Sequence, residues 1–346
     1  MKRALNVVLT GDINLRGIED PAVPFSMLER QFRAADLVFG NLECCLFDAP
    51  GGGPRSNPAF FAPSIAAGAA LKLGGIQAVG IANNVNFGDA PIRASIARLD
   101  ELGIAHTGAG MNLAEARAPV VLNRQGARIG VLQRTSVYWA ANHEAKDDAP
   151  GVAVIRGHTA YQLPLHRETQ PMNRPGVPPI IMTWTDPDYL ARFKEDLAAL
   201  CGKSDIVIAS FHWGSGAEVH QYMSEIAHAA IDGGADVVIG HGPHDHLLPI
   251  EVYAGKPIFY GMGALSFRIG HIGHVHNWVG IVASIGFSDK ALMSAKFQFV
   301  RQNDNMQIMP SRLEDEQVAL DKIRQRSLPY GTQVTQADGQ AAVALQ

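Results

Sequence analysis

The segment VVIGHGPH, residues 237–244, joins a continuous apolar run to a turn that contains two histidines. A short apolar run bounded by turn residues predicts a buried strand. His241 and His244 lie directly beyond that strand, where Gly242 and Pro243 restrict the backbone. Imidazole is a common protein ligand for metal ions. Two histidines in so constrained a turn indicate a metal site, and this is the most specific motif in the chain.

Four upstream segments repeat the pattern of an apolar run followed by polar residues. The runs are residues 5–9, 37–39, 78–82 and 206–211, and they lead to Asp12, Glu43, Asn84 and His212. Helical patterns separate several of them, at 25–35, 65–73, 91–102 and 225–231. Repeated strand–loop–helix units predict an α/β fold, in which ligands bind at the carboxyl ends of the strands. We therefore expect the polar residues at these strand ends to form one site.

The expected metal ligands combine carboxylates, amide oxygens and imidazoles. They are Asp12, Asn14, Glu43, Asn84, His212, His241 and His244. This chemistry suits a borderline or hard divalent cation, and the histidines must be neutral to bind it. The residue types do not distinguish Mn²⁺, Mg²⁺, Ca²⁺, Zn²⁺ or an iron ion, nor one ion from two. Each residue alone also has an ordinary structural interpretation, such as a turn residue for Asp12 or an arginine partner for Glu43.

The composition excludes some classes of function. The formal net charge is −4 and no basic run is present, which argues against a nucleic-acid surface. Three cysteines without a framework spacing favour a reducing compartment. The N-terminal apolar stretch is too short for a signal sequence, and no later segment has the roughly 18 apolar residues of a membrane span. We expect a cytoplasmic protein with a small-molecule or peptide-like substrate; whether it forms a homo-oligomer stays open.

Residues 136–190 interrupt the alternation of strands and helices. They are rich in proline, histidine and tryptophan, which predicts a long insertion. Such an insertion either roofs a pocket or is an ordinary structural loop. We expect one domain over residues 1–310 that contains this insertion, and a peripheral C-terminal tail at 311–346.

Three residues are candidates for proton transfer. His246 lies two positions beyond His244 and would point to the same side in an extended turn. Glu218 follows the strand end at His212. It is either a catalytic acid or base, or a residue at the start of a helix with no catalytic role. His274 belongs to an H-x-x-H-x-H pattern that either supplies a general acid or is an ordinary set of loop histidines without a catalytic role.

Three further residues are candidates for substrate binding. Arg134, Tyr138 and Trp139 follow a predicted strand and could contact a carboxylated substrate, with Arg134 as the charged partner. The alternative for Tyr138 and Trp139 is a place in the core. Cys44 and Cys45 directly follow Glu43, and we interpret them as small buried residues rather than as reactive thiols.

The ordered set of motifs resembles the CapA-type poly-γ-glutamate capsule synthesis proteins (PGA_cap), which look like relatives of the calcineurin-like metallophosphoesterases. The motifs are Gly11-Asp12, Asn41-Leu42-Glu43, Ala82-Asn83-Asn84, His212-Trp213-Gly214 and Gly240-His241-Gly242-Pro243-His244, and the resemblance covers about residues 5–270. It implies a four-layer α/β/β/α sandwich with one or two metals between the sheets. It also implies that Asp12 and His244 hold one metal, that Asn84, His212 and His241 hold the other, and that Glu43 bridges them.

The chain departs from the family pattern at two positions. Asn14 stands where relatives often have histidine, and Val85 replaces the histidine that helps to protonate the leaving group. Ordinary phosphoesterase activity is therefore in doubt. We expect a divalent-metal-dependent hydrolase that acts on an amide- or carboxylate-rich substrate, such as a glutamyl or peptide-like molecule. The alternatives are a metal-assisted epimerase of a peptide-like substrate and a non-catalytic CapA-like accessory protein.

Overall fold

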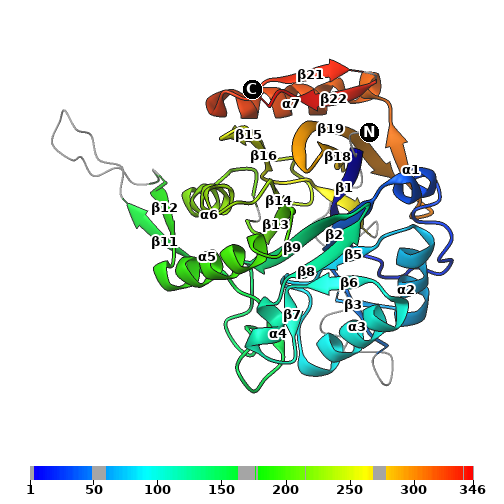
Figure 1. The fold of residues 1–346 in the computed structure, drawn as a ribbon, viewed down its shortest axis with the longest axis vertical. Coiled ribbons are helices and arrows are strands. Elements are labelled where there is room, and N and C mark those ends of the chain that lie inside the picture. Colours follow the sequence, from blue (N-terminus) through cyan, green and yellow to red (C-terminus); the bar gives the residue numbers. More distant parts are fainter. Residues whose placement is uncertain are drawn as a thin grey trace.

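The structure is a computed structural model, and it describes residues 4–48, 60–162, 176, 178–214, 216–267, 278–337 and 339–345. The N-terminal apolar run forms β1 (Ala4–Ile13), near the middle of a ten-stranded sheet with the order β21-β22-β19-β18-β1-β2-β5-β6 (Figure 1). On one side of β1 the strands are parallel to it and to one another: β2 (Leu37–Leu42), β5 (Ala78–Gly80) and β6 (Ala105–Thr107). On the other side are antiparallel β18 (Gly280–Ser288) and β19 (Ala291–Gln302), and β17 (Ala264–Ser266) pairs with the end of β1.

A second sheet of six strands has the order β15-β16-β14-β13-β9-β8. Its central strands are parallel: β9 (Ala127–Thr135), β13 (Ile206–His212), β14 (Val237–His241) and β16 (Lys256–Phe259). The outer strands, β8 (Val120–Arg124) and β15 (Ile250–Tyr253), are antiparallel. The strands predicted at 206–211 and 237–240 are thus neighbours, and both carry a histidine as their last residue.

Helices cover the outer faces of the two sheets. The first sheet is covered by helices that include α1 (Glu29–Ala34), α2 (Ser64–Leu73) and α3 (Asp89–Leu102), and α4 (Leu113–Arg117) lies nearby. The second is covered by α5 (Pro187–Cys201) and α6 (Gln221–Asp232). The start of α5 is defined locally, because Asp186 caps it by accepting hydrogen bonds from the Asp188 and Tyr189 amides, and Pro187 is its first residue.

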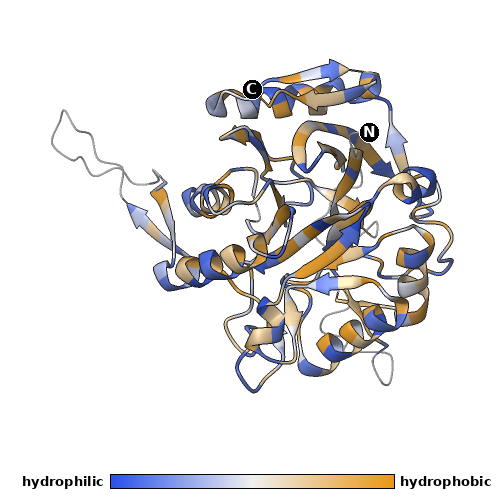
Figure 2. Ribbon diagram, in the orientation of Figure 1, coloured by the Kyte–Doolittle hydropathy of each residue, from blue (hydrophilic) through white to orange (hydrophobic). Residues whose placement is uncertain are grey.

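The two faces of each sheet belong to different hydrophobic clusters. In β1, Val7 and Leu9 point to the core between the sheets, whereas Val8 packs toward the helical side. In the second sheet, Ile208 faces the inter-sheet core and Ala209 faces α5 and α6. This alternation follows from the two-residue period of a strand. The layers are therefore helix, sheet, sheet and helix, and the predicted α/β/β/α sandwich is confirmed. Figure 2 shows the apolar strands inside and helices with one apolar and one polar face.

The interrupted region has two parts that differ in position. Its first part, up to about residue 156, packs on the body and buries Val152 and Ile155. Its second part is a ribbon of β11 (Gly157–Gln162) and β12 (Ile180–Thr185), which lies beside α6 and extends outward (Figure 1). Two other short pairs are β3 (Cys45–Leu46) with β4 (Phe61–Ala62), and β7 (Ala109–Gly110) with β10 (Gly151–Val152).

The C-terminal segment is an integral part of the fold, in contrast to the peripheral tail that we expected. It contains β20 (Ile308–Ser311), the 3₁₀ turn η2 (Leu313–Glu316), α7 (Gln317–Ser327), η3 (Leu328–Tyr330), β21 (Val334–Ala337) and β22 (Gln340–Val343). Strand β22 pairs with β19, and Leu320 and Ile323 of α7 are fully buried in the inter-sheet core. Within the described residues, no helix is long and apolar enough to cross a membrane.

Candidate metal centre

The ligand residues predicted from the strand ends converge from both sheets. The ten-stranded sheet contributes Asp12 in β1, Glu43 directly after β2 and Asn84 after β5. The six-stranded sheet contributes His212 and His241, which are paired in register at the ends of β13 and β14, and His244 in the following turn.

Four contacts join carboxylates of the first sheet to imidazoles of the second. Asp12 Oδ1 lies 3.2 Å from His241 Nδ1, and Asp12 Oδ2 lies 2.9 Å from His244 Nδ1. Glu43 Oε1 lies 3.2 Å from His244 Nε2 and 3.5 Å from His212 Nε2. All these residues are buried except His244, which is half-buried. Oxygen and nitrogen ligands therefore face each other across the gap between the sheets.

Backbone geometry and an amide side chain hold Asp12 in place. Its Oδ1 accepts a hydrogen bond of 2.7 Å from Asn41 Nδ2, and its Oδ2 accepts one of 3.1 Å from the Gly242 amide. Gly242 has a φ of +115°, and a Cβ atom there would lie 2.9 Å from the carbonyl oxygens of Trp213 and Gly214. Glycine is therefore required between the two histidines, because a larger residue would be strained and crowded.

The electrostatic balance keeps the carboxylates ionised despite their burial. Burial alone would raise the pKa of Asp12, but His241 and His244 outweigh it and hold the pKa well below its usual value. The pKa of Glu43 is lowered as well: burial and the charge of Asp12 act to raise it, and His244 and His212 outweigh both. Burial would lower the pKa of His244, but Glu43 and Asp12 raise it to about 10. The site thus concentrates negative charge at a buried point, where a cation is favoured.

The donor atoms of the site fit a metal ion. Among the described residues, Glu43 Oε2, Asn84 Oδ1 and His241 Nε2 are buried and have no hydrogen-bond partner, while His241 Nδ1 and His212 Nε2 lie 3.2 Å and 3.5 Å from a carboxylate oxygen without forming a regular hydrogen bond. A buried polar atom without a partner costs about 1–3 kcal/mol, so these atoms together need an explanation. One ligand atom each from Asp12, Glu43 and His244 also lies within 4.8 Å of the others. A cation between the sheets would satisfy these atoms.

Asn14 lies beside this set but uses its amide differently. Its Nδ2 donates to the Glu43 carbonyl oxygen at 2.8 Å, and its Oδ1 accepts from the Arg16 amide at 3.1 Å. Asn14 therefore holds the backbone that presents Glu43. Because an amide oxygen has a second lone pair, its role as a metal ligand stays a prediction.

The three candidates for proton transfer do not join the cluster. The side chains of His246 and Glu218 are exposed, and neither makes a hydrogen bond to the ligand set in the described part of the chain. His274 lies outside the described residues. The turn that carries His246 bends at Pro243, whose carbonyl oxygen accepts from the His246 amide at 3.3 Å. The extended geometry that would point His246 back to the site is therefore not formed.

Arg134 points away from the site, contrary to the substrate-binding role that we predicted. It is buried and donates to Asp196 Oδ2 at 2.6 Å, to the Gln133 carbonyl oxygen at 2.7 Å and to the Arg117 carbonyl oxygen at 3.0 Å. The reason is the alternation of side chains along β9. Arg134 occupies the helical face, so its neighbours Gln133 and Thr135 occupy the face toward the site.

Tyr138 and Trp139 differ in their position relative to the site. The Tyr138 hydroxyl accepts from Arg156 Nε at 2.9 Å, and the ring packs against the helical-side core. Trp139 is 48% exposed, and its indole Nε1 donates to the Asn84 carbonyl oxygen at 2.8 Å. Trp139 therefore forms a wall beside a candidate ligand, whereas Tyr138 is structural.

Sequence reasoning missed the amides that organise the site from behind. Asn41 Oδ1 accepts 3.0 Å hydrogen bonds from Asn83 Nδ2 and from Gln133 Nε2, and Gln133 Oε1 accepts one of 2.7 Å from the Ala82 amide. Thr135 Oγ1 lies 3.3 Å from His212 Nδ1, which orients that ring. Two features of the sequence could have predicted these residues. Asn41 lies at the end of a predicted strand, and Gln133 and Thr135 flank Arg134 and so point to the opposite face of the sheet.

His143 of the interrupted region is also a buried neighbour of the site. Its Nδ1 accepts from the Trp139 amide at 3.0 Å, and its Nε2 lies 3.1 Å from the Asn86 carbonyl oxygen. Burial lowers its pKa to about 4, so the ring is neutral and its N–H is committed to Asn86. His143 consequently does not supply the proton donor that Val85 lacks. Burial also raises the pKa values of Cys44 and Cys45 to about 12, which makes both inert thiols.

The chain matches one family model and several curated proteins. The model of the family described as bacterial capsule synthesis protein PGA_cap matches residues 6–268. A probable polyglutamine synthesis accessory protein of Mycobacterium tuberculosis is 32% identical over 190 residues, which are 53% of this chain and 43% of that protein. The PGA biosynthesis protein CapA of Bacillus subtilis is 26% identical over 251 residues, 71% of this chain and 57% of that protein.

The chain spans 60% or less of the length of the curated relatives that it matches. A solved structure, a phosphatase from Mycoplasma pneumoniae, aligns with 86% of this chain and 94% of its own, at 14% identity and a TM-score of 0.47.

Proposed function

The chain belongs to the PGA_cap family of bacterial capsule synthesis proteins, and from that premise we propose that it is a divalent-metal-dependent hydrolase of glutamyl or peptide-like substrates. The observation that carries the proposal is the set of buried ligand atoms of Glu43, Asn84, His212 and His241 that lack a regular hydrogen bond. A purely structural cluster would satisfy these atoms internally. Their arrangement supports a resident cation.

The family resemblance suggests two ligand groups around a shared carboxylate. Asp12 and His244 would hold one ion, Asn84, His212 and His241 would hold a second, and Glu43 would bridge them. When bound, the ion would supply Lewis acidity to a carbonyl oxygen and would acidify a water molecule. The protein's own contribution is orientation: Asn41 and the Gly242 amide fix Asp12, and Thr135 fixes the His212 ring.

The substrate class is proposed from chemistry and from the named relatives. Val85 has no titratable proton, and the N–H of His143, which contacts the neighbouring residue Asn86, is committed to the Asn86 carbonyl oxygen. Phosphoester cleavage that relies on a histidine at this position is therefore disfavoured, and a hydrolase of amides would have to pass the proton of the attacking water to the amine leaving group. The relatives from Bacillus subtilis and Mycobacterium tuberculosis carry names that refer to PGA biosynthesis and to polyglutamine synthesis. Both names support a glutamyl polymer or peptide.

A second candidate is a non-catalytic accessory protein that binds such a polymer through the same metal centre. The word accessory in the name of the Mycobacterium tuberculosis relative favours it, and so does the lack of a proton donor at position 85. Metal content is expected in both cases, so the two candidates differ only in turnover.

The first test is the metal content of the purified chain, measured by inductively coupled plasma mass spectrometry. We expect one or two divalent ions per wild-type chain and a large loss in Asp12→Ala and His241→Ala. Lys194→Ala changes an exposed residue of α5 and serves as the matched control. Full retention of metal by both site variants would overturn the assignment.

The second test is turnover of γ-glutamyl peptides, peptides that differ in one D-residue, and phosphodiesters, with and without EDTA. Metal-dependent cleavage of a glutamyl peptide supports the hydrolase. Interconversion of the D- and L-peptides without cleavage would favour epimerase chemistry instead. Full metal occupancy with no turnover on any of them would favour the accessory role.

A further inference from the structure

A cavity of about 380 Å³ lies between the histidine turn and α7. Residues 245–247, which directly follow His244, form one wall, and Lys322 and Arg326 of α7 form the other. Trp278, at the start of the segment that leads into β18, also lines it. The family match ends at residue 268, so Trp278 and α7 are features of this chain outside the matched region.

The cavity is lined by three acidic and three basic side chains, and they differ in whether they are paired. Of its acidic residues, Glu316 is paired with Arg301, with Glu316 Oε2 accepting from Nη2 at 2.7 Å, and Asp315 is paired with Arg312. Asp245 is not free either. Lys322, in contrast, is exposed and has no acidic partner among the described residues.

Arg326 adds a second cation with unused donors. Its Nη1 donates to the Leu247 carbonyl oxygen at 2.6 Å, a neutral partner, and no acidic side chain among the described residues forms an ion pair with the guanidinium. A guanidinium has five N–H groups, so the other donors remain available to a ligand. The same hydrogen bond ties α7 to the turn that carries His244.

The remaining lining is apolar and includes one buried indole. Trp278 is 7% exposed, and Leu247, Val318 and Ala319 lie around the same cavity. An inorganic anion would leave this apolar surface without a contact. An organic anion with an aliphatic part would contact both the cations and the apolar wall.

We propose that this cavity, the α7 cavity, binds a carboxylate-bearing residue of the substrate beside the metal centre. Lys322 and Arg326 pair with the carboxylate, and Trp278 and Leu247 contact its aliphatic chain. The identity of the ligand rests on the proposed function, because a glutamyl substrate carries such a group at every residue. Recognition by α7 would give this chain a specificity that the matched family region does not encode.

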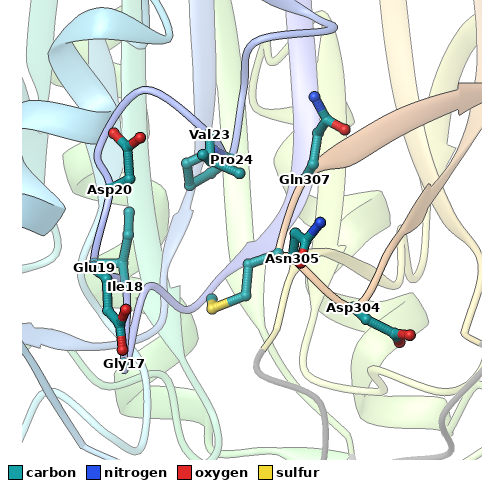
Figure 3. A pocket seen from close by; sticks show the side chains of 10 residues that line it. Gly17, Ile18, Glu19, Asp20, Val23, Pro24, Asp304, Asn305 and Gln307 are labelled. Carbon is teal, nitrogen blue, oxygen red and sulfur yellow. The ribbon is translucent and has the colours of Figure 1, made fainter.

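A larger cavity of about 620 Å³ does not support a ligand in the same way. Figure 3 shows that it lies between residues 17–24 and the turn at 304–307, with Glu19, Asp20 and Asp304 among its lining side chains. These acidic groups are at the surface, and no buried polar atom without a partner points into the cavity within the described residues. The α7 cavity is therefore the better founded site.

The test is titration calorimetry with N-acetyl-L-glutamate on the full chain, after removal of metal with EDTA. We expect binding by the wild type, weakening of at least about tenfold in Lys322→Glu, and an intermediate loss in Lys322→Gln, because a hydrogen bond to a charged group is lost. Lys194→Glu makes the same charge change on the exposed face of α5 and should bind like the wild type. The neutral analogue N-acetyl-L-glutamine amide should bind much more weakly.

Three outcomes would overturn the proposal: no binding by the wild type, equal binding by Lys322→Glu and Lys194→Glu, or loss of binding in Asp12→Ala. The last outcome would place the carboxylate at the metal ligands. Because the assay uses metal-free protein, a failure here leaves the metal content and turnover tests intact. Conversely, binding that persists in Asp12→Ala supports the cavity even when turnover of glutamyl peptides is absent.

Discussion

Two charged clusters, one partly and one almost fully buried, lie on opposite faces of the six-stranded sheet, and they differ in how many of their polar atoms have hydrogen-bond partners. On the helical face, Arg134 and Arg117 both pair with Asp196, at 2.6 Å and 2.8 Å. On the inter-sheet face, His212 and His241 contact carboxylates and still leave ring nitrogens without a hydrogen bond among the described residues. The first cluster is complete without a ligand and the second is not. Whether the polar atoms have hydrogen-bond partners, more than their burial or charge, separates a structural cluster from a candidate site.

The largest expected effect breaks the complete cluster. Asp196→Ala removes the carboxylate from a guanidinium that is only 3% exposed, so an uncompensated charge stays buried. We expect a loss of about 3–5 kcal/mol in the free energy of unfolding, measured by urea denaturation in EDTA. Glu195→Ala, an exposed neighbour on α5, is the control and should change little. A loss below about 1 kcal/mol would show that the cluster is not held by this pair.

A pH series examines the buried neighbour of the site, because burial lowers the pKa of His143. The pKa of His143 in the folded protein is about 4, below its value of 6.5 when unfolded. The unfolded chain therefore binds the extra proton, so stability falls as pH decreases from 6.5 to 4 and levels off below. The loss is at most about 3 kcal/mol. In metal-free protein, the difference between wild type and His143→Phe should shrink over this range; a constant difference would contradict the assignment.

The smallest expected effect comes from adding a metal ion to the inter-sheet cluster of carboxylates and histidines. Adding Mn²⁺ or Zn²⁺ at a hundred times its dissociation constant should stabilise the wild type by about 2.7 kcal/mol in urea denaturation. Asp196→Ala should gain the same increment from its lower baseline, because its metal ligands are intact. Asp12→Ala should gain none. Equal gains in Asp12→Ala and the wild type would show that the ion binds elsewhere.

The comparison also shows what sequence reasoning could reach. The strand-end pattern predicted that Asp12, Glu43 and the three histidines lie close together, and their side chains are in contact, because parallel strands end at a common edge. Their role as metal ligands stays a prediction. The prediction for Arg134 failed because neighbouring residues of a strand point to opposite faces of the sheet, and no motif in the sequence shows which face Arg134 occupies. The C-terminal segment was expected to be peripheral because most of its residues are polar or charged. The apolar residues Leu313, Leu320 and Ile323, which are buried, were not recognised as a core-facing pattern. His143 was out of reach, since its contacts depend on the path of a long insertion.

Gln133 ties the two sheets together, and this has a consequence for ion selectivity. Its side chain extends from β9 and donates from Nε2 to Asn41 in β2. Its Oε1 accepts a hydrogen bond from the Ala82 amide, in the loop before Asn84. Its side chain also passes so close to Gly80 that a Cβ atom there would lie 2.3 Å from it. These contacts thus help to set the separation of the sheets, and that separation determines the distance between the oxygen ligands and the imidazoles. Repacking the apolar layer between the sheets, far from any ligand, would change the radius of the cation that fits.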